Sequence, residues 1–182
     1  MTEIDKTKIS TKLLWVDLEM TGLDPQKDVI LEVAAEVTDF SFKTLASFEA
    51  LIKHPQSLLS ASNPWAYDQH TKSGLFERIQ TEGRPESEVQ AELVHFIDDN
   101  FSGESAVLAG NSIHNDRLFI RRWWPDVEAL LHYRMLDVSS WKLVMQGKFG
   151  VDYDKKDTHR AFDDIQASIA ELQYYLEELK RD

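Results

Sequence analysis

The sequence contains no cysteine, which excludes disulfide bonds, thiolate zinc sites and cysteine nucleophiles together. Long hydrophobic runs are also missing, because no apolar stretch approaches the roughly 20 residues that a membrane-spanning helix needs. No segment rich in proline, glycine or serine divides the 182 residues, and this length is typical of one domain. We therefore expect a single domain over residues 1–182, with residues 1–10 as a flexible N-terminus.

The first twelve residues are polar and of mixed charge. They lack the apolar core and the small-residue cleavage site of a secretory signal peptide. Since the chain also lacks cysteine and a hydrophobic span, the sequence favours a cytoplasmic enzyme or binding domain with no membrane partner.

Positive charge is scarce, because 20 lysines and arginines stand against 32 aspartates and glutamates, a net charge of −12. Such a chain should not carry the basic track that holds a long polyanion, so long duplex DNA is a poor candidate partner. Half of the excess lies in residues 77–104, where eight acids stand against two arginines. None of the candidate site residues described below lies in that segment.

The chain begins with three predicted strands and then alternates strands with helices. The strands are expected at residues 13–19, 29–37, 44–52, 106–111 and 134–138, and the helices from Pro64, over 85–99, from about Asn115 and from about Ala161. Asn63 is the predicted N-cap of the first helix, with Pro64 at its first position. The first three strands suggest an antiparallel meander, and the whole order indicates a mixed sheet covered by helices, an α/β domain.

Asp17 and Glu19 interrupt what otherwise reads as a central strand. Positions i and i+2 of a strand point to the same face and lie about 6.6 Å apart along it. Burying two carboxylates side by side is costly unless a cation or a proton compensates. Two divalent ions about 3.5–4 Å apart would fit between such ligands. The alternative is that both side chains lie in solvent at the end of the strand.

Asp116 follows the predicted strand over residues 106–111 and opens the next helix. An acid in the first turn of a helix is favoured by the helix dipole alone, which is the simpler interpretation. The position also lies at the end of a strand, where α/β sheets tend to bind their ligands.

Two neighbouring acids, Asp163 and Asp164, begin the last helix, and the helical wheel separates them. At about 100° per residue, Asp163 points roughly 150° from the centre of the apolar stripe and hence into solvent. Asp164 lies roughly 110° from it, on the flank that can reach back over the sheet. His159 precedes this helix in a predicted loop, and a lone histidine is more often structural or merely exposed. Its position five residues before a candidate metal ligand is better explained by a general base, because the ordinary pKa of histidine is about 6.5.

Three segments of the chain together resemble the exonuclease motifs of the DEDDh class. They are Trp15-Val16-Asp17-Leu18-Glu19-Met20-Thr21-Gly22-Leu23, Gly110-Asn111-Ser112 ahead of Asp116, and His159 with Asp164. Within that class the chain is similar to the oligoribonuclease family over nearly its whole length. This branch is indicated by Asn63-Pro64-Trp65, by the segment His70 to Leu75 and by the segment Tyr133 to Ser139.

The resemblance implies one exonuclease domain with a ribonuclease-H-like fold, in which a mixed five-stranded sheet is flanked by helices. It implies 3′→5′ removal of mononucleotides from very short, dinucleotide-sized single-stranded RNA, which yields nucleoside 5′-monophosphates. It also implies two divalent ions, Mg²⁺ or Mn²⁺, and a general base. The metal ligands would be Asp17, Glu19, Asp116 and Asp164, and the base would be His159.

The resemblance further assigns residues to the substrate. Leu23 would wedge against the bases, with Trp65 nearby. The terminal phosphate of a dinucleotide would be capped by His70, Ser112, Arg134 and Ser139. The family is dimeric, which implies a homodimer in which Tyr133 reaches the site of the partner.

Two other functions remain open on the sequence. A proofreading exonuclease that trims DNA 3′ ends would share all five catalytic residues and would differ in the phosphate-capping ones. A catalytically silent interaction module could keep the fold, although such a module has no reason to keep five costly polar groups together.

Overall fold

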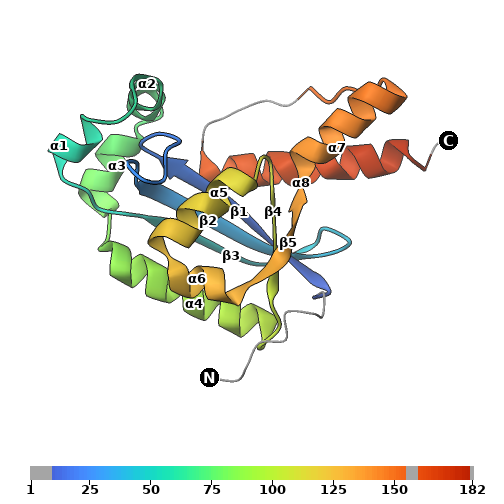
Figure 1. Ribbon diagram of the computed structural model, residues 1–182, viewed down its shortest axis with the longest axis horizontal. Coiled ribbons are helices and arrows are strands. Elements are labelled where there is room, and N and C mark those ends of the chain that lie inside the picture. The colour runs from blue at the N-terminus through green and yellow to red at the C-terminus, as the bar shows by residue number, and fades with distance from the viewer. Residues whose placement is uncertain (1–9, 155–159, 181–182) are drawn as a thin grey trace.

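The structure, a computed structural model, describes residues 10–154 and 160–180. Its five strands form one sheet in the order β3-β2-β1-β4-β5 (Figure 1). The strands are β1 (Lys12–Met20), β2 (Ile30–Asp39), β3 (Thr44–Leu51), β4 (Ala106–Gly110) and β5 (Leu131–Asp137). β2 pairs antiparallel with β1 and β3, whereas β4 pairs parallel with β1 and β5. The predicted meander and the mixed five-stranded sheet are therefore confirmed.

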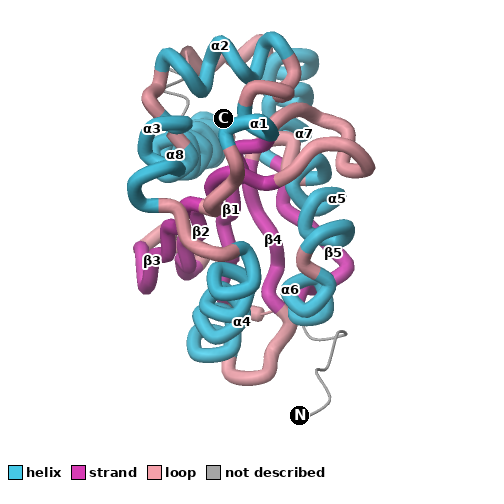
Figure 2. The backbone as a smooth tube through the Cα atoms, turned by 90° about the vertical axis from the view of Figure 1, so that its left-hand side faces the viewer, coloured by secondary structure: helices cyan, strands magenta, loops and turns pink. Residues whose placement is uncertain are grey.

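Helices lie on both faces of this sheet (Figure 2). They are α1 (Gln56–Leu59), α2 (Pro64–Lys72), α3 (Leu75–Glu82), α4 (Glu86–Phe101), α5 (His114–Trp123), α6 (Pro125–Leu130), α7 (Val138–Val144) and α8 (Ala161–Glu178), and a π-helical turn over Met145–Phe149 continues α7. The sequence predicts α2, α4, α5 and α8, whereas α1, α3, α6 and α7 are additional. No helix in the described part of the chain is long and apolar enough to cross a membrane.

Alternation along β1 divides the core into two layers. Leu14 and Val16 pack in one cluster with apolar residues of α4, α5 and α6. Leu13 and Trp15 pack on the opposite face in a second cluster with α8. All four side chains are buried, as expected for a central strand whose residues point alternately to two covered faces. Asp17 and Glu19 continue the series of Leu13 and Trp15, so they face the α8 side.

The last helix shows the predicted apolar stripe with one difference. Ile165, Ile169 and Leu172 are buried against the sheet, whereas Leu179 at the C-terminal end is exposed. Polar side chains share the buried face, because Ser168, Glu171 and Tyr175 are also nearly inaccessible to solvent. These three residues follow Asp164 at helical spacing, so one flank of α8 carries a buried polar row.

The strand predicted from Arg134 begins earlier, at Leu131. The reason is an irregularity in its pairing with β4, which breaks the alternating pattern that identifies strands. Ala106 pairs with Leu131 and Leu108 pairs with Met135, so Val107 alone lies opposite three residues of β5. Of the predicted flexible segment 1–10, all but Ser10 lies outside the described residues.

Candidate active site

Three carboxylates meet at the end of β1. The alternation of the strand places Asp17 and Glu19 on the α8 face, and the first turn of α8 contributes Asp164. One oxygen of each carboxylate lies within 4.8 Å of the others. All three side chains are half-buried, whereas neighbouring Asp163 is exposed, as the helical wheel predicts. Asp17 and Glu19 lie at the end of the strand and are partly shielded from solvent.

Asp116 lies beside this cluster in the first turn of α5 and is nearly fully buried. The pairing of β4 with β1 ends where Ala109 lies opposite Trp15. Further along β1, the backbone N–H of Leu18 donates to Asp116 Oδ1 at 3.0 Å. Gly110 permits this close turn, because a Cβ there would lie 2.9 Å from the carbonyl oxygen of Val16. The Asp116 carboxylate is thereby oriented toward the end of β1.

The electrostatics of this acidic cluster favour a cation. Burial, together with the charges of Glu32, Asp164 and Asp116, raises the pKa of Glu19 to about 8. Burial also raises the pKa of Asp116 well above the ordinary aspartate range. Like-charged carboxylates held together in this way either take up protons or bind a cation. Carboxylate oxygens are the ligands that Mg²⁺ and Mn²⁺ prefer, so the donor set fits a divalent ion.

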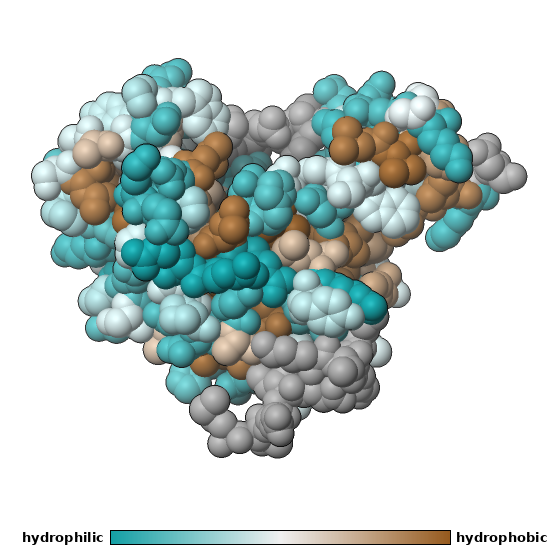
Figure 3. Space-filling model, viewed as in Figure 1, coloured by the Kyte–Doolittle hydropathy of each residue, from teal (hydrophilic) through white to brown (hydrophobic). Residues whose placement is uncertain are grey.

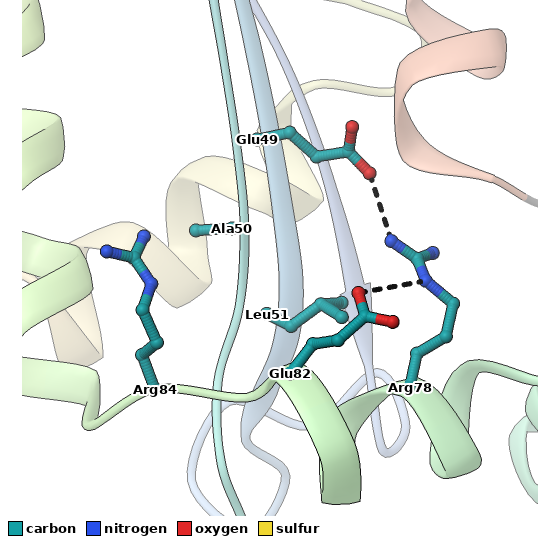
Figure 4. A pocket seen from close by; sticks show the side chains of 6 residues that line it. All are labelled: Glu49, Ala50, Leu51, Arg78, Glu82 and Arg84. Carbon is teal, nitrogen blue, oxygen red and sulfur yellow. Dashed lines mark hydrogen bonds and ion pairs between the residues drawn. The ribbon is translucent and has the colours of Figure 1, made fainter.

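Glu32 connects the cluster to an ion-pair network at the edge of the sheet. It lies opposite Glu19 in the pairing of β1 with β2, is buried, and accepts a hydrogen bond from Arg78 at 3.1 Å. Arg78 also contacts Glu49 and Glu82, as Figure 4 shows, in a pocket of about 260 Å³ beside β3. Arg78 is paired with Glu49 and Glu82, and Arg84, which also lines the pocket, is paired with Glu92, so the pocket is a poor candidate for substrate binding.

His70 lies next to the acidic cluster and is buried. Its Nε2 donates to the carbonyl oxygen of Met20 at 2.8 Å, and its Nδ1 lies 3.8 Å from an oxygen of Glu19. Asn63, at the start of α2, donates its backbone N–H to the carbonyl oxygen of Thr21 at 2.7 Å. These two bonds join α2 to the end of β1 and fix His70 beside Glu19.

Two large apolar side chains that are close in sequence to Thr21 and Asn63 are exposed to solvent. Leu23 lies in the loop after β1 and is 75% exposed, and Trp65 lies in the first turn of α2 and is 64% exposed. Exposed apolar side chains beside a polar site are suited to contact an apolar ligand surface such as a base.

Ser112 and Ser139 are brought together although 27 residues separate them. Their hydroxyl oxygens lie 3.0 Å apart, and both backbone N–H groups donate to Asp137 Oδ1. Ser112 has a φ of 49°, a conformation that a non-glycine residue adopts only when its surroundings hold it. Asp137 is therefore the residue that fixes the serine pair, and the sequence interpretation did not single it out.

A buried polar network extends from this serine pair into α8. Asn111 Oδ1 accepts from the Ser139 hydroxyl at 3.4 Å, and its Nδ2 donates to Ser168 and Glu171, both at 3.1 Å. Glu171 accepts in turn from the Tyr175 hydroxyl at 2.8 Å. The sequence does carry a signal for this network, because Asp164, Ser168, Glu171 and Tyr175 recur at helical spacing.

The remaining predicted site residues are placed less centrally or not described. Tyr133 and Arg134 lie on β5 with exposed side chains, and the Arg134 guanidinium lies 5.1 Å from the centre of the Tyr133 ring. His159 lies outside the described residues.

The comparisons with known proteins agree with one another. The family model described as exonuclease (RNase T) matches residues 14–172. Oligoribonuclease from Halorhodospira halophila is 41% identical over 93% of this chain and 94% of its own length. Oligoribonuclease from Francisella tularensis subsp. holarctica is 40% identical over 92% of this chain and 95% of its own length.

Solved structures with the same fold include exonuclease I from two organisms. The enzyme from Methylocaldum szegediense superposes with a TM-score of 0.64 at 19% identity over 93% of this chain. The metal-free complex of Escherichia coli exonuclease I with single-stranded DNA has a TM-score of 0.64 at 17% identity over 88% of this chain. The chain spans only 41% and 38% of those structures. At such identities the likeness shows the fold alone.

Proposed function

Because the chain belongs to the oligoribonuclease branch of the exonuclease family, we propose that it hydrolyses very short, dinucleotide-sized RNA in the 3′→5′ direction. The products are nucleoside 5′-monophosphates. The observation that carries this proposal is the acidic cluster of Asp17, Glu19 and Asp164, with Asp116 oriented beside it. Holding like-charged carboxylates this close together is costly unless a cation or a proton compensates.

In this proposal the four carboxylates hold two divalent ions, Mg²⁺ or Mn²⁺. The chemistry that bound ions supply at such a site is a lower pKa for the attacking water and neutralisation of the departing 3′-oxygen. The protein contributes the fixed positions of the ligands. Leu18 orients Asp116 through its N–H, and His70 lies against Glu19 while bound to the carbonyl of Met20.

His159 is the proposed general base, which takes a proton from the attacking water. The support is its sequence position five residues before Asp164 and the family resemblance. Histidine suits this role because its charge changes near neutral pH.

We assign the substrate contacts to residues on both sides of the acidic cluster. Leu23 wedges against the bases and Trp65 lies nearby. The terminal phosphate is capped by His70, Ser112, Arg134 and Ser139. The support for this capping is the pre-assembled Ser112–Ser139 pair, together with the exposed guanidinium of Arg134. A closed cap on the terminal phosphate would exclude strands that continue beyond it, which explains a preference for very short RNA.

A homodimer in which Tyr133 reaches the partner's site is the proposed assembly. Apolar side chains gather over α7 at the upper right of Figure 3, where Leu143 and Val144 are 73% and 51% exposed. Tyr133 is itself 60% exposed. Sedimentation at micromolar concentration should give twice the chain mass of 21.0 kDa, and a monomer that is fully active would refute this assembly.

A length series of 5′-labelled RNA, from two nucleotides upward, tests the proposed function. With Mn²⁺ present, the dinucleotide should be cleaved fastest and the rate should fall with length, whereas chelator should abolish cleavage. Asp17→Asn should be inactive, and Asp163→Asn, its exposed control, should keep wild-type rates. Faster trimming of a twenty-nucleotide DNA than of the RNA dinucleotide would establish the proofreading alternative instead. Activity that survives chelation would refute the metal-dependent mechanism.

A further inference from the structure

The pairing of β5 with β4 contains a bulge of unusual size at the sheet edge. Val107 of β4 lies opposite His132, Tyr133 and Arg134 of β5, so two residues of β5 have no counterpart. A bulge leaves backbone groups without ladder partners and turns side chains away from the regular alternation. His132 is fully buried, whereas the next two side chains point into solvent.

Arg117 supplies the partners that the bulge lacks. This arginine is only 8% exposed, and its Nη1 donates to the carbonyl oxygens of His132 at 2.9 Å and of Tyr133 at 3.3 Å. A buried carbonyl without a donor is costly, so this guanidinium stabilises the bulged backbone. The fork of five donors in an arginine can reach both carbonyls and a carboxylate together, which a lysine cannot do.

Glu128 holds that guanidinium in place. Its carboxylate accepts from Arg117 Nε at 3.3 Å and from Nη2 at 3.1 Å. Arg121 contacts the same carboxylate at 3.1 Å but its side chain is 61% exposed. Within the described part of the chain, Arg121 pairs with Glu128 alone. It therefore contacts the same carboxylate as Arg117 but does not contact the carbonyls of the bulge.

The bulge also builds a stack that ends at Arg134. The rings of His132 and Tyr133 are stacked with centroids 4.4 Å apart, and the Arg134 guanidinium lies 5.1 Å from the Tyr133 ring. The backbone N–H of Arg134 donates to His132 Nδ1 at 3.0 Å. The opposite ring nitrogen, Nε2, is buried without a hydrogen-bond partner among the described residues. A buried donor without a partner, such as His132 Nε2, is costly and calls for an explanation. Here the His132 ring supports the ring of Tyr133.

We propose that Arg117 is a positioning residue for Tyr133 and Arg134, and that it sets the affinity of the enzyme for the terminal phosphate of short RNA. The inference rests on the proposed capping role of Arg134 and adds the element that holds this residue in place. Arg117 acts through the bulge carbonyls and touches no substrate. Its loss should therefore weaken substrate capture and leave the acidic cluster unchanged.

Steady-state kinetics of Arg117→Lys on an RNA dinucleotide test this inference. The KM should rise about tenfold or more, while kcat changes little. That is the factor expected when a misplaced Arg134 loses a charged hydrogen bond to the terminal phosphate. Arg121→Ala is the matched control and should keep the wild-type KM. Calorimetric titration with Mn²⁺ should give wild-type affinity for both variants. An unchanged KM in folded Arg117→Lys, or a Mn²⁺ affinity lost in proportion to the KM effect, would overturn the inference.

A double-mutant cycle separates this inference from the proposed function. If Arg117 acts through Arg134, the effect of Arg117→Lys on KM should largely disappear in an Arg134→Ala background. Additive effects in the cycle would contradict positioning. If Arg134→Ala alone leaves the KM unchanged, the proposed capping role fails, and the positioning role fails with it. Should Arg117→Lys not fold, Glu128→Gln removes the anchor and takes its place in the same cycle.

Discussion

Glu19 shows how the site is kept ready for a cation. Its half-buried carboxyl lies near three other acids, and this environment raises its pKa to about 8. Arg78 pairs with the neighbouring Glu32, and the His70 ring nitrogen lies 3.8 Å from an oxygen of Glu19. The metal-free protein therefore stores unfavourable electrostatic energy that a divalent ion would relieve.

This arrangement predicts an unusual pH dependence of stability. Between the ordinary glutamate pKa of 4.5 and about 8, the folded state binds a proton at Glu19 that the unfolded state has released. The free energy of unfolding of the metal-free protein should therefore fall as the pH rises through this window, by up to about 1.4 kcal/mol per pH unit. Urea unfolding in the presence of chelator at pH 6 and pH 8 measures this fall.

Mg²⁺ should reverse the trend, because it competes with the proton and binds more tightly at higher pH. Glu19→Gln should flatten the pH dependence of the metal-free protein, whereas Glu49→Gln, at the exposed edge of the same network, should keep it. A metal-free protein that gains stability from pH 6 to pH 8 would contradict the electrostatic description of the site.

The proposed general base makes a second prediction at the residue scale. His159→Ala should lower kcat by roughly 10²–10⁴, the usual contribution of a general base, because the attacking water loses its proton acceptor. Mn²⁺ affinity and dinucleotide KM should stay close to wild type. Rapid-quench measurement of the chemical step decides the matter, and a wild-type rate in the variant would remove His159 from the mechanism.

The sequence identifies those site residues whose pattern lies within a single helix or strand. Asp17 and Glu19 follow from period two, and the choice of Asp164 over Asp163 follows from the helical wheel, because both arguments concern one element. Asp137 was missed, because an acid before a helix normally serves as an N-cap, and this one also holds Ser112 from another element. Such long-range contacts leave no mark in a local pattern.

The helices and strands that the sequence predicts are likewise those with a strong local pattern. The long strands and α8 have enough turns or alternations for their periodicity to be recognised. α1, α6 and α7 have 4, 6 and 7 residues, too few for a helical stripe. β5 was recognised only from Arg134, since the bulge over residues 132–134 removes the alternation that would have extended it. The strand segment that presents Tyr133 and Arg134 was thus the least predictable part of the sheet.

The N-cap of α2 carries a prediction at this scale. The Asn63 side chain accepts the N–H of Trp65 at 3.0 Å, and α2 carries both Trp65 and His70. Asn63→Ala should lower the free energy of unfolding by about 1 kcal/mol, whereas Asn63→Asp, which keeps the acceptor, should change it little. Chemical denaturation of the three proteins tests this, and equal stability of all three would show that the cap contributes nothing.

For the whole molecule, the net charge of −12 narrows the substrate and does not exclude nucleic acid. The acidic excess of residues 77–104 belongs mainly to α3 and α4. These two helices follow α2 in the chain and carry no proposed site residue. The four proposed ligands account for a further share, and two divalent ions would neutralise it. The acidic composition therefore disfavours a long electrostatic track, whereas bound divalent ions would offer local positive charge to one or two phosphates.

Binding of a dinucleotide should accordingly depend weakly on salt. One or two phosphate contacts predict a slope of about −0.7 to −1.4 in a plot of log K against log salt concentration. The measurement is the affinity of the inactive Asp17→Asn variant, or of wild type with Ca²⁺, over a series of potassium chloride concentrations with the divalent ion held constant. A slope several times steeper would mean that the substrate contacts a basic surface that this account does not contain.

Competition between a short and a long RNA measures whether the enzyme acts preferentially on very short RNA. Wild-type protein with Mn²⁺ is given an equimolar mixture of an RNA dinucleotide and a twenty-nucleotide RNA, both 5′-labelled. The ratio of their early rates equals the ratio of kcat/KM. We predict that the dinucleotide is consumed at least tenfold faster, since one capped phosphate contact is worth about that factor. Equal consumption of the two RNAs, or faster loss of the longer one, would contradict the account.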